Sequence, residues 1–265
     1  MDHPLGTPPH WLAAGRLDSA PMPDAPASNR LLVLQHIGCE RPAAYEDELL
    51  ARGLTLDRVQ LDAGDALPDW RLYVGIVAMG GPMGTYEANR HPWLTAEMEL
   101  VAEAVHADKP FWGVCLGAQL LAASLGATVS PGHGPEVGVL PVELTAEAAQ
   151  DPVFSQAPAS FPAFHWHGDT YTLPPGAVHL ARSELYEQQV FAYRNAYALQ
   201  FHLEVTPQLV AEWGQVDAYA SSLASLPGEN PLATLVDQVS AVEGSAIPLA
   251  RELFARWLLD VVGIA

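Results

Sequence analysis

The first half of the chain alternates short apolar runs with segments of helical periodicity. The apolar runs are short and continuous, as expected of strands buried on both faces of a sheet, and they lie at residues 31–34, 73–79 and 111–114. Helices are predicted over residues 42–52, 92–107 and 116–125. Strands that alternate with helices through short connections form βαβ units. The pattern therefore predicts an α/β fold with a doubly wound, mostly parallel sheet flanked by helices.

The second half is richer in strands, and its pattern predicts an antiparallel extension of the sheet. Strands are predicted over residues 137–144, 164–167, 190–193 and 197–203. The last two flank Arg194-Asn195-Ala196, which is expected to form a hairpin turn. Thr206-Pro207 has the composition of a helix start. Helices are predicted over residues 207–226, 230–242 and 246–262.

Charge narrows the range of partners. Twelve basic residues against 31 acidic ones give a net charge of −19, which argues against nucleic acid or an anionic membrane as a partner and favours solubility. Hydrophobic residues make up 49% of the chain, enough for a large core, so wholesale disorder is excluded. In the helix predicted over 92–107, Glu97, Glu99 and Glu103 are expected to face solvent.

Prolines separate the N-terminus from the rest of the chain. Six of them interrupt every pattern in residues 1–28, which are predicted to form an extension without regular structure. Residues 29–226 would form the α/β domain, and residues 227–265 a helical extension packed on it. No apolar run reaches the ~18 residues of a spanning helix. We find no signal-peptide pattern, and the two cysteines make no disulfide framework, so a cytoplasmic location is predicted.

Cys115 is placed where a buried strand gives way to an apolar helix. In Gly113-Val114-Cys115-Leu116-Gly117, glycines two residues before and two after the cysteine allow the close approach of a nucleophile elbow. A thiol at a helix N-terminus is expected to have a lowered pKa, because backbone N–H groups and the helix dipole favour the thiolate. A small cysteine packed behind a strand is the alternative for a lone thiol, and the paired glycines favour the nucleophile.

A thiol nucleophile needs a base, and the chain has ten histidines. His202 is predicted at the end of a strand with Glu204 two residues on, so both side chains point to the same side and the carboxylate can orient the ring. An exposed strand-end pair without a catalytic role is the alternative. If His202 is not the base, His167 or His165 would take its place.

Acyl transfer also needs N–H donors for the developing oxyanion. The Leu116 N–H, directly after the cysteine, is one candidate. The turn Gly80-Gly81-Pro82-Met83-Gly84 follows another predicted strand end. Because the carboxyl ends of parallel strands meet at one crevice, the Gly81 N–H is the second candidate, with a plain turn as the alternative.

Together these motifs resemble the class I, triad-type glutamine amidotransferases. The resemblance lies in residues 113–119 (Gly-Val-Cys-Leu-Gly-Ala-Gln), residues 80–82 (Gly-Gly-Pro) and residues 202–204 (His-Leu-Glu), in that family's order. It covers about residues 31–226 and points to the stand-alone group similar to the glutaminase domain of GMP synthase. The resemblance implies a flavodoxin-like fold, a triad of Cys115, His202 and Glu204, and an oxyanion hole formed by the N–H groups of Gly81 and Leu116.

The same resemblance implies how glutamine would be held. Gln119 matches the family's glutamine-binding residue and lies one helical turn beyond the cysteine on the same face. The turn residue Gly80 would contact the substrate, and the stretch His167-Gly168-Asp169 matches a loop that closes over its α-amino and carboxylate groups. Two further matches are expected to shape the pocket, Glu136-Val137-Gly138 and Gln189-Val190-Phe191. No cofactor is implied, and no Cys-x-x-Cys or His-x-x-x-His spacing indicates a metal.

By resemblance, Cys115 would attack the γ-carboxamide of glutamine and form a γ-glutamyl thioester with release of ammonia. The chain contains neither a Ser-Gly-Gly-x-Asp-Ser loop nor a Walker A sequence, so the ammonia would pass to a separate synthetase. Two alternatives remain: a stand-alone hydrolase or transferase of γ-glutamyl compounds, and a non-enzymatic regulatory module. An ammonia donor is expected to rest with the Gly81 N–H turned away from Cys115. The purified chain is therefore predicted to turn glutamine over slowly, with a thiol at Cys115 that still alkylates.

Many members of the family have a proline between the histidine and the glutamate, where this chain has Leu203. Cys39, which follows the first predicted strand, is not expected to act as a redox partner of Cys115, because cytosolic disulfides are rare. Whether copies of the chain associate into a homo-oligomer is left open.

Overall fold

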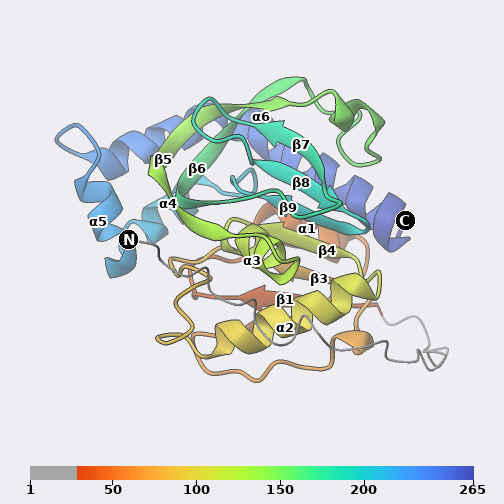
Figure 1. The fold of residues 1–265 in the computed structure, drawn as a ribbon. Helices are drawn as coiled ribbons and strands as arrows, with labels where there is room; N and C mark the ends of the chain where they lie inside the picture. The colour runs from red at the N-terminus through yellow and green to blue at the C-terminus, as the bar shows by residue number, and fades with distance from the viewer. Residues whose placement is uncertain (1–28) are drawn as a thin grey trace, which may run out of the picture.

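A nine-stranded sheet organises residues 29–265, the part of the chain that the computed structural model describes (Figure 1). The extension proposed for residues 1–28 lies outside these residues. The strand order is β2-β1-β3-β4-β9-β8-β7-β5-β6. The strands are β1 (Arg30–Gln35), β2 (Thr55–Gln60), β3 (Gly75–Ala78), β4 (Phe111–Val114), β5 (Val129–Leu144), β6 (Ser160–Tyr171), β7 (Val178–Arg182), β8 (Val190–Tyr193) and β9 (Ala196–Leu199).

The predicted α/β fold with a doubly wound sheet is confirmed. Strands β2, β1, β3, β4 and β9 are parallel, and β1 lies between β2 and β3. The chain therefore changes direction across the sheet at β1, and ligands of open α/β sheets bind beyond the carboxyl ends of the strands at such a switch point. The helices are α1 (Ala44–Ala51), α2 (Trp93–His106), α3 (Leu116–Ser124), α4 (Pro207–Trp213), α5 (Asp217–Ala224) and α6 (Pro231–Arg256).

Alternate side chains of the buried strands feed two separate cores. Leu31 and Val33 of β1 pack on the face covered by α1 and α6, whereas Leu32 and Leu34 pack on the face covered by α2 and α3. The period of two along a strand sends successive side chains to opposite faces. A strand covered on both faces has no polar side to expose, and this explains the continuous apolar runs of the sequence.

The antiparallel extension is also confirmed. β5 and β6 are longer than predicted, β8 has the predicted bounds and β9 is shorter. β8 and β9 form a hairpin whose turn contains Arg194 at a φ of 54°. Beyond them, β7, β5 and β6 continue the sheet in antiparallel order. β5 and β6 pair over nearly their full length, with a register shift between Pro131 and Glu136.

Several element boundaries differ from the prediction. β2 and β7 were not predicted, and β2 shows why: it is an edge strand with one buried residue, Val59, and hence no apolar run. The helix predicted over 207–226 is two helices, α4 and α5. The two helices predicted over 230–242 and 246–262 are one helix, α6, which continues as a π-helical segment, Trp257–Val262.

Helix α6 runs through Pro248 because packing compensates for the lost hydrogen bond. Buried residues lie on both sides of the proline, including Val239 before it and Leu253 after it. At the C-terminal end, Phe254 and Trp257 stack on each other and contact Trp112 of β4. Residues 246–258 thus contribute to the same core as the parallel sheet, whereas Leu235 and Val239 pack in a separate cluster with α4 and β6. No helix in residues 29–265 is long and apolar enough to cross a membrane.

Candidate active site

Cys115 occupies a strained turn between β4 and α3. Its φ of 52° and ψ of −105° lie in a region that residues other than glycine rarely adopt. A Cβ atom on Gly113 would lie 2.6 Å from the Gly117 carbonyl oxygen, and one on Gly117 would lie 2.1 Å from the Ala78 carbonyl oxygen. Both glycines are therefore required for the close contact of α3 with β3 and β4. The close approach predicted for this motif is present.

His202 and Glu204 lie together beside Cys115 and are buried, with exposed fractions of 1% and 0%. The Nδ1 atom of His202 lies 2.7 Å from Oε1 of Glu204, and the other carboxylate oxygen accepts the Leu203 N–H. His202 and Glu204 were predicted to pair because they lie two residues apart on one strand, but the structure places them beyond the end of that strand. β9 ends at Leu199, and His202 is held by a single antiparallel bridge to Phe164 of β6 rather than by a continuous strand.

His202 and the Cys115 thiol shift each other's pKa. Burial disfavours the charged form of His202, but the Glu204 carboxylate and the Cys115 thiol outweigh burial and raise the pKa of His202 well above its ordinary value. Burial raises the pKa of the Cys115 thiol, and the neighbouring His202 ring and the Leu116 N–H offset part of this rise. The expectation of a lowered thiol pKa is therefore wrong, because burial outweighs the helix N-terminus. The thiol needs a base at this position.

The turn after β3 contains the second predicted oxyanion donor. No acceptor within residues 29–265 pairs with the Gly81 N–H, and Gly81 lines the same cavity as Cys115. The preceding carbonyl, that of Gly80, accepts a hydrogen bond of 3.1 Å from Nδ1 of His36. His36 follows β1 directly and is fully buried.

Glu97 of α2 is buried and does not face solvent as predicted. Its exposed fraction is 0%, and its Oε1 atom lies 2.8 Å from Nε2 of His36. Glu99 and Glu103 are exposed, as predicted. The prediction failed because the Glu97 side chain faces the end of β1, where its carboxylate pairs with the buried His36 ring.

Glu40 is a buried carboxyl group that the sequence did not reveal as part of the site. A Cβ atom on Gly80 would lie 1.9 Å from its Oε2 atom and 3.4 Å from the Cβ atom of Cys115. The Tyr219 hydroxyl of α5 donates a hydrogen bond to its other oxygen. Burial raises the pKa of Glu40 to about 7, although nearby His202 and His36 lower it. No local pattern marks this residue, because its neighbours come from distant segments.

A cavity of about 310 Å³ opens above Cys115. It is bounded by the turn after β3, the start of β5, the end of β6 and helix α5, whose residues Ala218, Tyr219 and Ser222 line one side. The residues singled out in the sequence that line it are Gly81, Cys115, Gln119, His167, Gly168 and Asp169. Among residues 29–265, no lysine or arginine lines the cavity, so negative charge on a ligand would be met there by polar groups and backbone N–H donors.

The stretch His167-Gly168-Asp169 belongs to β6 and is not the loop that was expected. It pairs with β5 across the register shift there, which turns this end of the hairpin over the cavity. Asp169 is half-buried, and burial raises the pKa of its carboxyl group, while the Tyr86 hydroxyl lowers it. Gln119 reaches the same cavity from α3 and donates to Oε1 of Gln200 at 3.2 Å.

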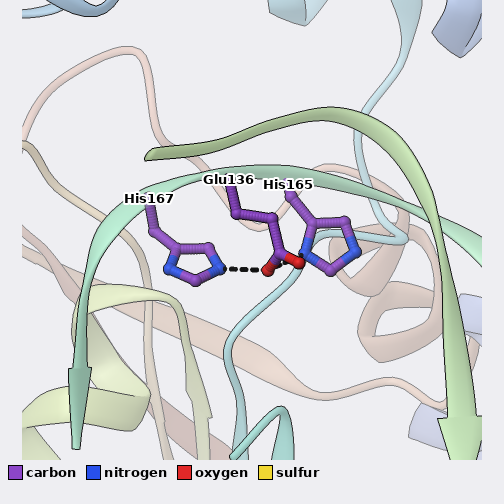
Figure 2. A group of neighbouring side chains, drawn as sticks. All are labelled: Glu136, His165 and His167. Carbon is purple, nitrogen blue, oxygen red and sulfur yellow. Dashed lines mark hydrogen bonds and ion pairs between the residues drawn. The ribbon is translucent and has the colours of Figure 1, made fainter. Parts of the chain in front are cut away.

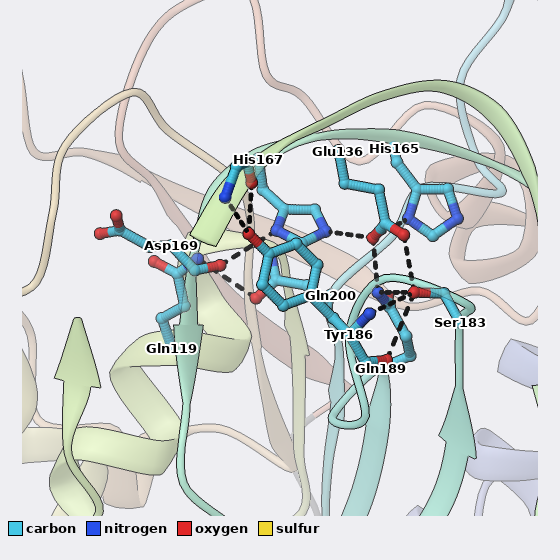
Figure 3. Close-up of polar contacts among 10 residues, drawn as sticks. Gln119, Glu136, His165, His167, Asp169, Ser183, Tyr186, Gln189 and Gln200 are labelled. Carbon is cyan, nitrogen blue, oxygen red and sulfur yellow. Dashed lines mark hydrogen bonds and ion pairs between the residues drawn. The ribbon is translucent and has the colours of Figure 1, made fainter. Parts of the chain in front are cut away.

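Glu136 of β5 lies between His167 and His165 of β6 (Figures 2 and 3). One of its oxygens lies 2.8 Å from Nε2 of His167 and 2.6 Å from Nε2 of Gln189, and the other accepts the Ser183 hydroxyl at 2.6 Å. Burial raises the pKa of Glu136, but His165, His167 and Ser183 outweigh burial and lower it well below its ordinary value. His167 also contacts the Asp169 carbonyl oxygen through Nδ1, so Glu136 fixes the ring that supports Asp169.

Glu136, His165 and His167 could in principle ligate a metal ion, since their ligating atoms lie within 4.8 Å of one another. The carboxylate oxygens, however, already accept hydrogen bonds from two amide or hydroxyl donors and one imidazole. His165 is buried, and burial lowers its pKa. Both histidines are thus engaged with Glu136, which leaves His202 as the ring that contacts the thiol.

Comparison with known proteins defines the family. A family model described as "Glutamine amidotransferase class-I" matches residues 44–211. The chain is 31% identical over 205 residues to the glutamine amidotransferase-like protein YfeJ of Salmonella typhimurium, covering 76% of this chain and 85% of that one. The crystal structure of a glutamine amidotransferase from Thermotoga maritima is 32% identical, with a TM-score of 0.78, and covers 88% of this chain and 99% of that one.

The chain belongs to the class I glutamine amidotransferase family, as the resemblance predicted. The GMP synthase of Thermomicrobium roseum is 36% identical over 132 residues, but these residues are 49% of this chain and only 23% of that enzyme. The relatives that match along most of their length are glutamine amidotransferases of similar size, whereas the match to this GMP synthase covers about a quarter of that enzyme. Family membership supports glutamine hydrolysis as the class of reaction.

The pKa of Glu40 predicts how stability depends on pH. Because the pKa of Glu40 in the folded protein is raised to about 7, the stabilisation from its protonated form is full below the ordinary pKa near 4.5 and is lost as pH rises through 7. We expect Glu40→Gln to remove this component, which amounts to ~3 kcal/mol between pH 5 and 8. Urea unfolding of wild type and variant across this range measures it. Glu99→Gln, at an exposed site, serves as the control, and parallel curves for wild type and Glu40→Gln would contradict the prediction.

Proposed function

We propose that this protein hydrolyses the γ-carboxamide of glutamine, or of a γ-glutamyl compound, through a thioester on Cys115. The observation that carries the proposal is the thiol on a strained turn, beside a buried His202–Glu204 pair and open to a cavity. A nucleophile, a base and a group that orients the base are the minimum for nucleophilic acyl transfer. Family membership supports the same class of reaction.

In the first half of the reaction, Nε2 of His202 takes the thiol proton while Nδ1 donates to Glu204. The thiolate attacks the γ-carbonyl carbon, and the negative charge that forms on the oxygen is held by the N–H groups of Leu116 and Gly81. The imidazolium then gives its proton to the leaving nitrogen, and ammonia or an amine departs. In the second half, His202 takes a proton from water, which attacks the thioester, and returns one to the sulfur as glutamate leaves.

The cavity matches the amino-acid end of such a substrate. Two carboxyl groups line the cavity, Asp169 and Glu87, and both support binding of an α-ammonium group. A positive charge beside Asp169 would offset the burial that now raises its pKa. Gln119 supplies an amide from α3, one turn beyond the nucleophile. The absence of lysine and arginine from the cavity lining fits a substrate whose charge is balanced within itself, as in glutamine.

Two fates of the released nitrogen remain as candidates. Similarity to the glutaminase part of GMP synthase supports delivery of ammonia to a separate synthetase. The hydrogen bond from His36 to the Gly80 carbonyl favours a second candidate, a stand-alone hydrolase of γ-glutamyl compounds, because it supports an oxyanion donor that is in place without a partner. A non-enzymatic module would retain neither activity.

Labelling tests the nucleophile. A γ-diazoketone analogue of glutamine is expected to alkylate Cys115 and to spare Cys39, whose pKa burial raises to about 11. Cys115→Ala should abolish hydrolysis and keep the fold, since a thiol-to-methyl change removes little volume. Peptide mass spectrometry locates the label, and Cys39→Ser is the matched control with full activity. Label on Cys39 alone would contradict the assignment.

The roles of the base and its partner predict unequal losses. His202→Ala should lower kcat by ~10³-fold or more, because the proton acceptor is removed. Glu204→Gln should cost less, because the amide still orients the ring. Steady-state release of glutamate measures both. Near-normal turnover by His202→Ala would transfer the role of base to another histidine, and equal losses in the two variants would give Glu204 a further task.

Turnover by the isolated protein distinguishes the two fates. The purified chain is assayed with glutamine and with a panel of γ-glutamyl amines, and released glutamate is measured. In contrast to the slow turnover expected from the sequence, we expect turnover that needs no second protein, because the hydrogen bond from His36 to the Gly80 carbonyl supports an oxyanion donor that is in place without a partner. Slow hydrolysis of every substrate, with a thiol that still alkylates, would instead support an ammonia donor that its synthetase switches on. Inactivity together with an inert thiol would refute the enzymatic proposal.

A further inference from the structure

We propose that His36, clamped by helix α2, is a positioning residue that fixes the Gly80–Gly81 peptide with its N–H towards Cys115. The inference rests on the proposed function, since it concerns the oxyanion donor of that reaction. Neither His36 nor its partner Glu97 was among the residues singled out in the sequence for the site. Both side chains have an exposed fraction of 0%.

The orientation of the peptide follows from the contact of its carbonyl. The Gly80 carbonyl can only accept, so Nδ1 of His36 carries the proton of their 3.1 Å hydrogen bond. The carbonyl of Gly80 and the N–H of Gly81 belong to one peptide group. No peptide bond in residues 29–265 is cis, so these two groups point in opposite directions.

The strand order then places the N–H. β3, which precedes the turn, lies between β1 and β4. His36 follows β1 and Cys115 follows β4, so they stand on opposite sides of the turn. A carbonyl directed at the β1 side leaves the N–H of Gly81 directed at the β4 side, towards the thiol. No acceptor within residues 29–265 competes for this N–H.

Helix α2 holds the histidine ring by two contacts. Trp93 stacks on it, with ring centroids 5.7 Å apart and an angle of 18° between the planes. Glu97, one turn further along the same face, lies 2.8 Å from Nε2. The ring can neither rotate nor withdraw without breaking a buried contact. Glu40 also faces this region, and its charge favours the protonated ring.

The Gly80–Gly81 peptide needs a contact that fixes its orientation, because the two glycines themselves do little to prevent its rotation. Two successive glycines allow the peptide to rotate at low steric cost. A rotated peptide would present a carbonyl oxygen, not an N–H, to the negative charge on the substrate oxygen. Loss of one such donor costs ~10²–10³ in kcat. The buried His36–Glu97 pair thus keeps the donor in place before any substrate or partner binds.

The test separates oxyanion binding from thiol chemistry. A γ-aldehyde analogue of glutamine adds to the thiol and forms a hemithioacetal whose oxygen occupies the oxyanion hole, whereas iodoacetamide alkylates the thiol without forming an oxyanion. For His36→Leu we expect a ~10²-fold loss both of kcat and of affinity for the aldehyde, with the alkylation rate of Cys115 nearly unchanged. Glu97→Gln should show the same pattern with a smaller loss. Glu99→Gln, on the exposed side of α2, should match wild type.

Two results would overturn the proposal. Wild-type aldehyde affinity in both His36→Leu and Glu97→Gln would show that the turn keeps its orientation alone, and equal losses of aldehyde affinity and alkylation would show general damage to the site. If His36→Leu does not fold, Glu97→Gln, which preserves shape, decides the question. The aldehyde measurement needs no turnover, so the variants decide the positioning role whether or not the wild-type protein releases glutamate. The proposed function is decided separately, by glutamate release and by the reactivity of the thiol.

Discussion

The contact between α3 and the ends of β3 and β4 is the constraint on which the rest of the site depends. Helix α3 sits so close to the sheet that no side chain fits at Gly113 or Gly117. The residue between them is forced into a positive φ, which lifts the Cys115 side chain out of the sheet and into the cavity. The turn is fixed by these steric limits and by backbone hydrogen bonds, from the Cys115 N–H to the Leu199 carbonyl and from the Gly117 N–H to the Met79 carbonyl. Neither constraint involves a charged side chain.

Buried charge is the second organising feature. Of the four buried glutamates in residues 29–265, three are paired with a buried histidine: Glu97 with His36, Glu136 with His167 and Glu204 with His202. A buried carboxylate is costly without such a partner. The fourth, Glu40, has a tyrosine hydroxyl instead, and its pKa is correspondingly raised. Each pair holds a different wall of the cavity: the turn after β3, the β5–β6 hairpin and the nucleophile side.

The features of the fold that could be predicted from the sequence are those that depend on residues close together in the chain. The parallel half of the sheet appears as apolar runs, and the elbow as two glycines around a cysteine, because both depend on residues close together in the chain. Glu97 was misjudged because its partner His36 is far away in sequence, so the helical pattern alone gave no sign of burial. β2 and the α4–α5 break were missed for a similar reason. The edge strand β2 buries one side chain, that of Val59, and helix α5 also buries one, that of Tyr219. Neither element therefore has an apolar pattern that marks its bounds.

The sheet order also has a consequence for the order in which the protein is made. β4 pairs with β9, and the whole antiparallel half of the sheet lies between them in sequence. A ribosome therefore delivers Cys115 long before His202 and Glu204, and β4 waits with one edge unpaired until β9 arrives. A nascent chain therefore contains Cys115 before it contains the His202–Glu204 pair that the proposed mechanism needs. Under that mechanism, the two halves of the site meet only after β9 has been synthesised and has paired with β4.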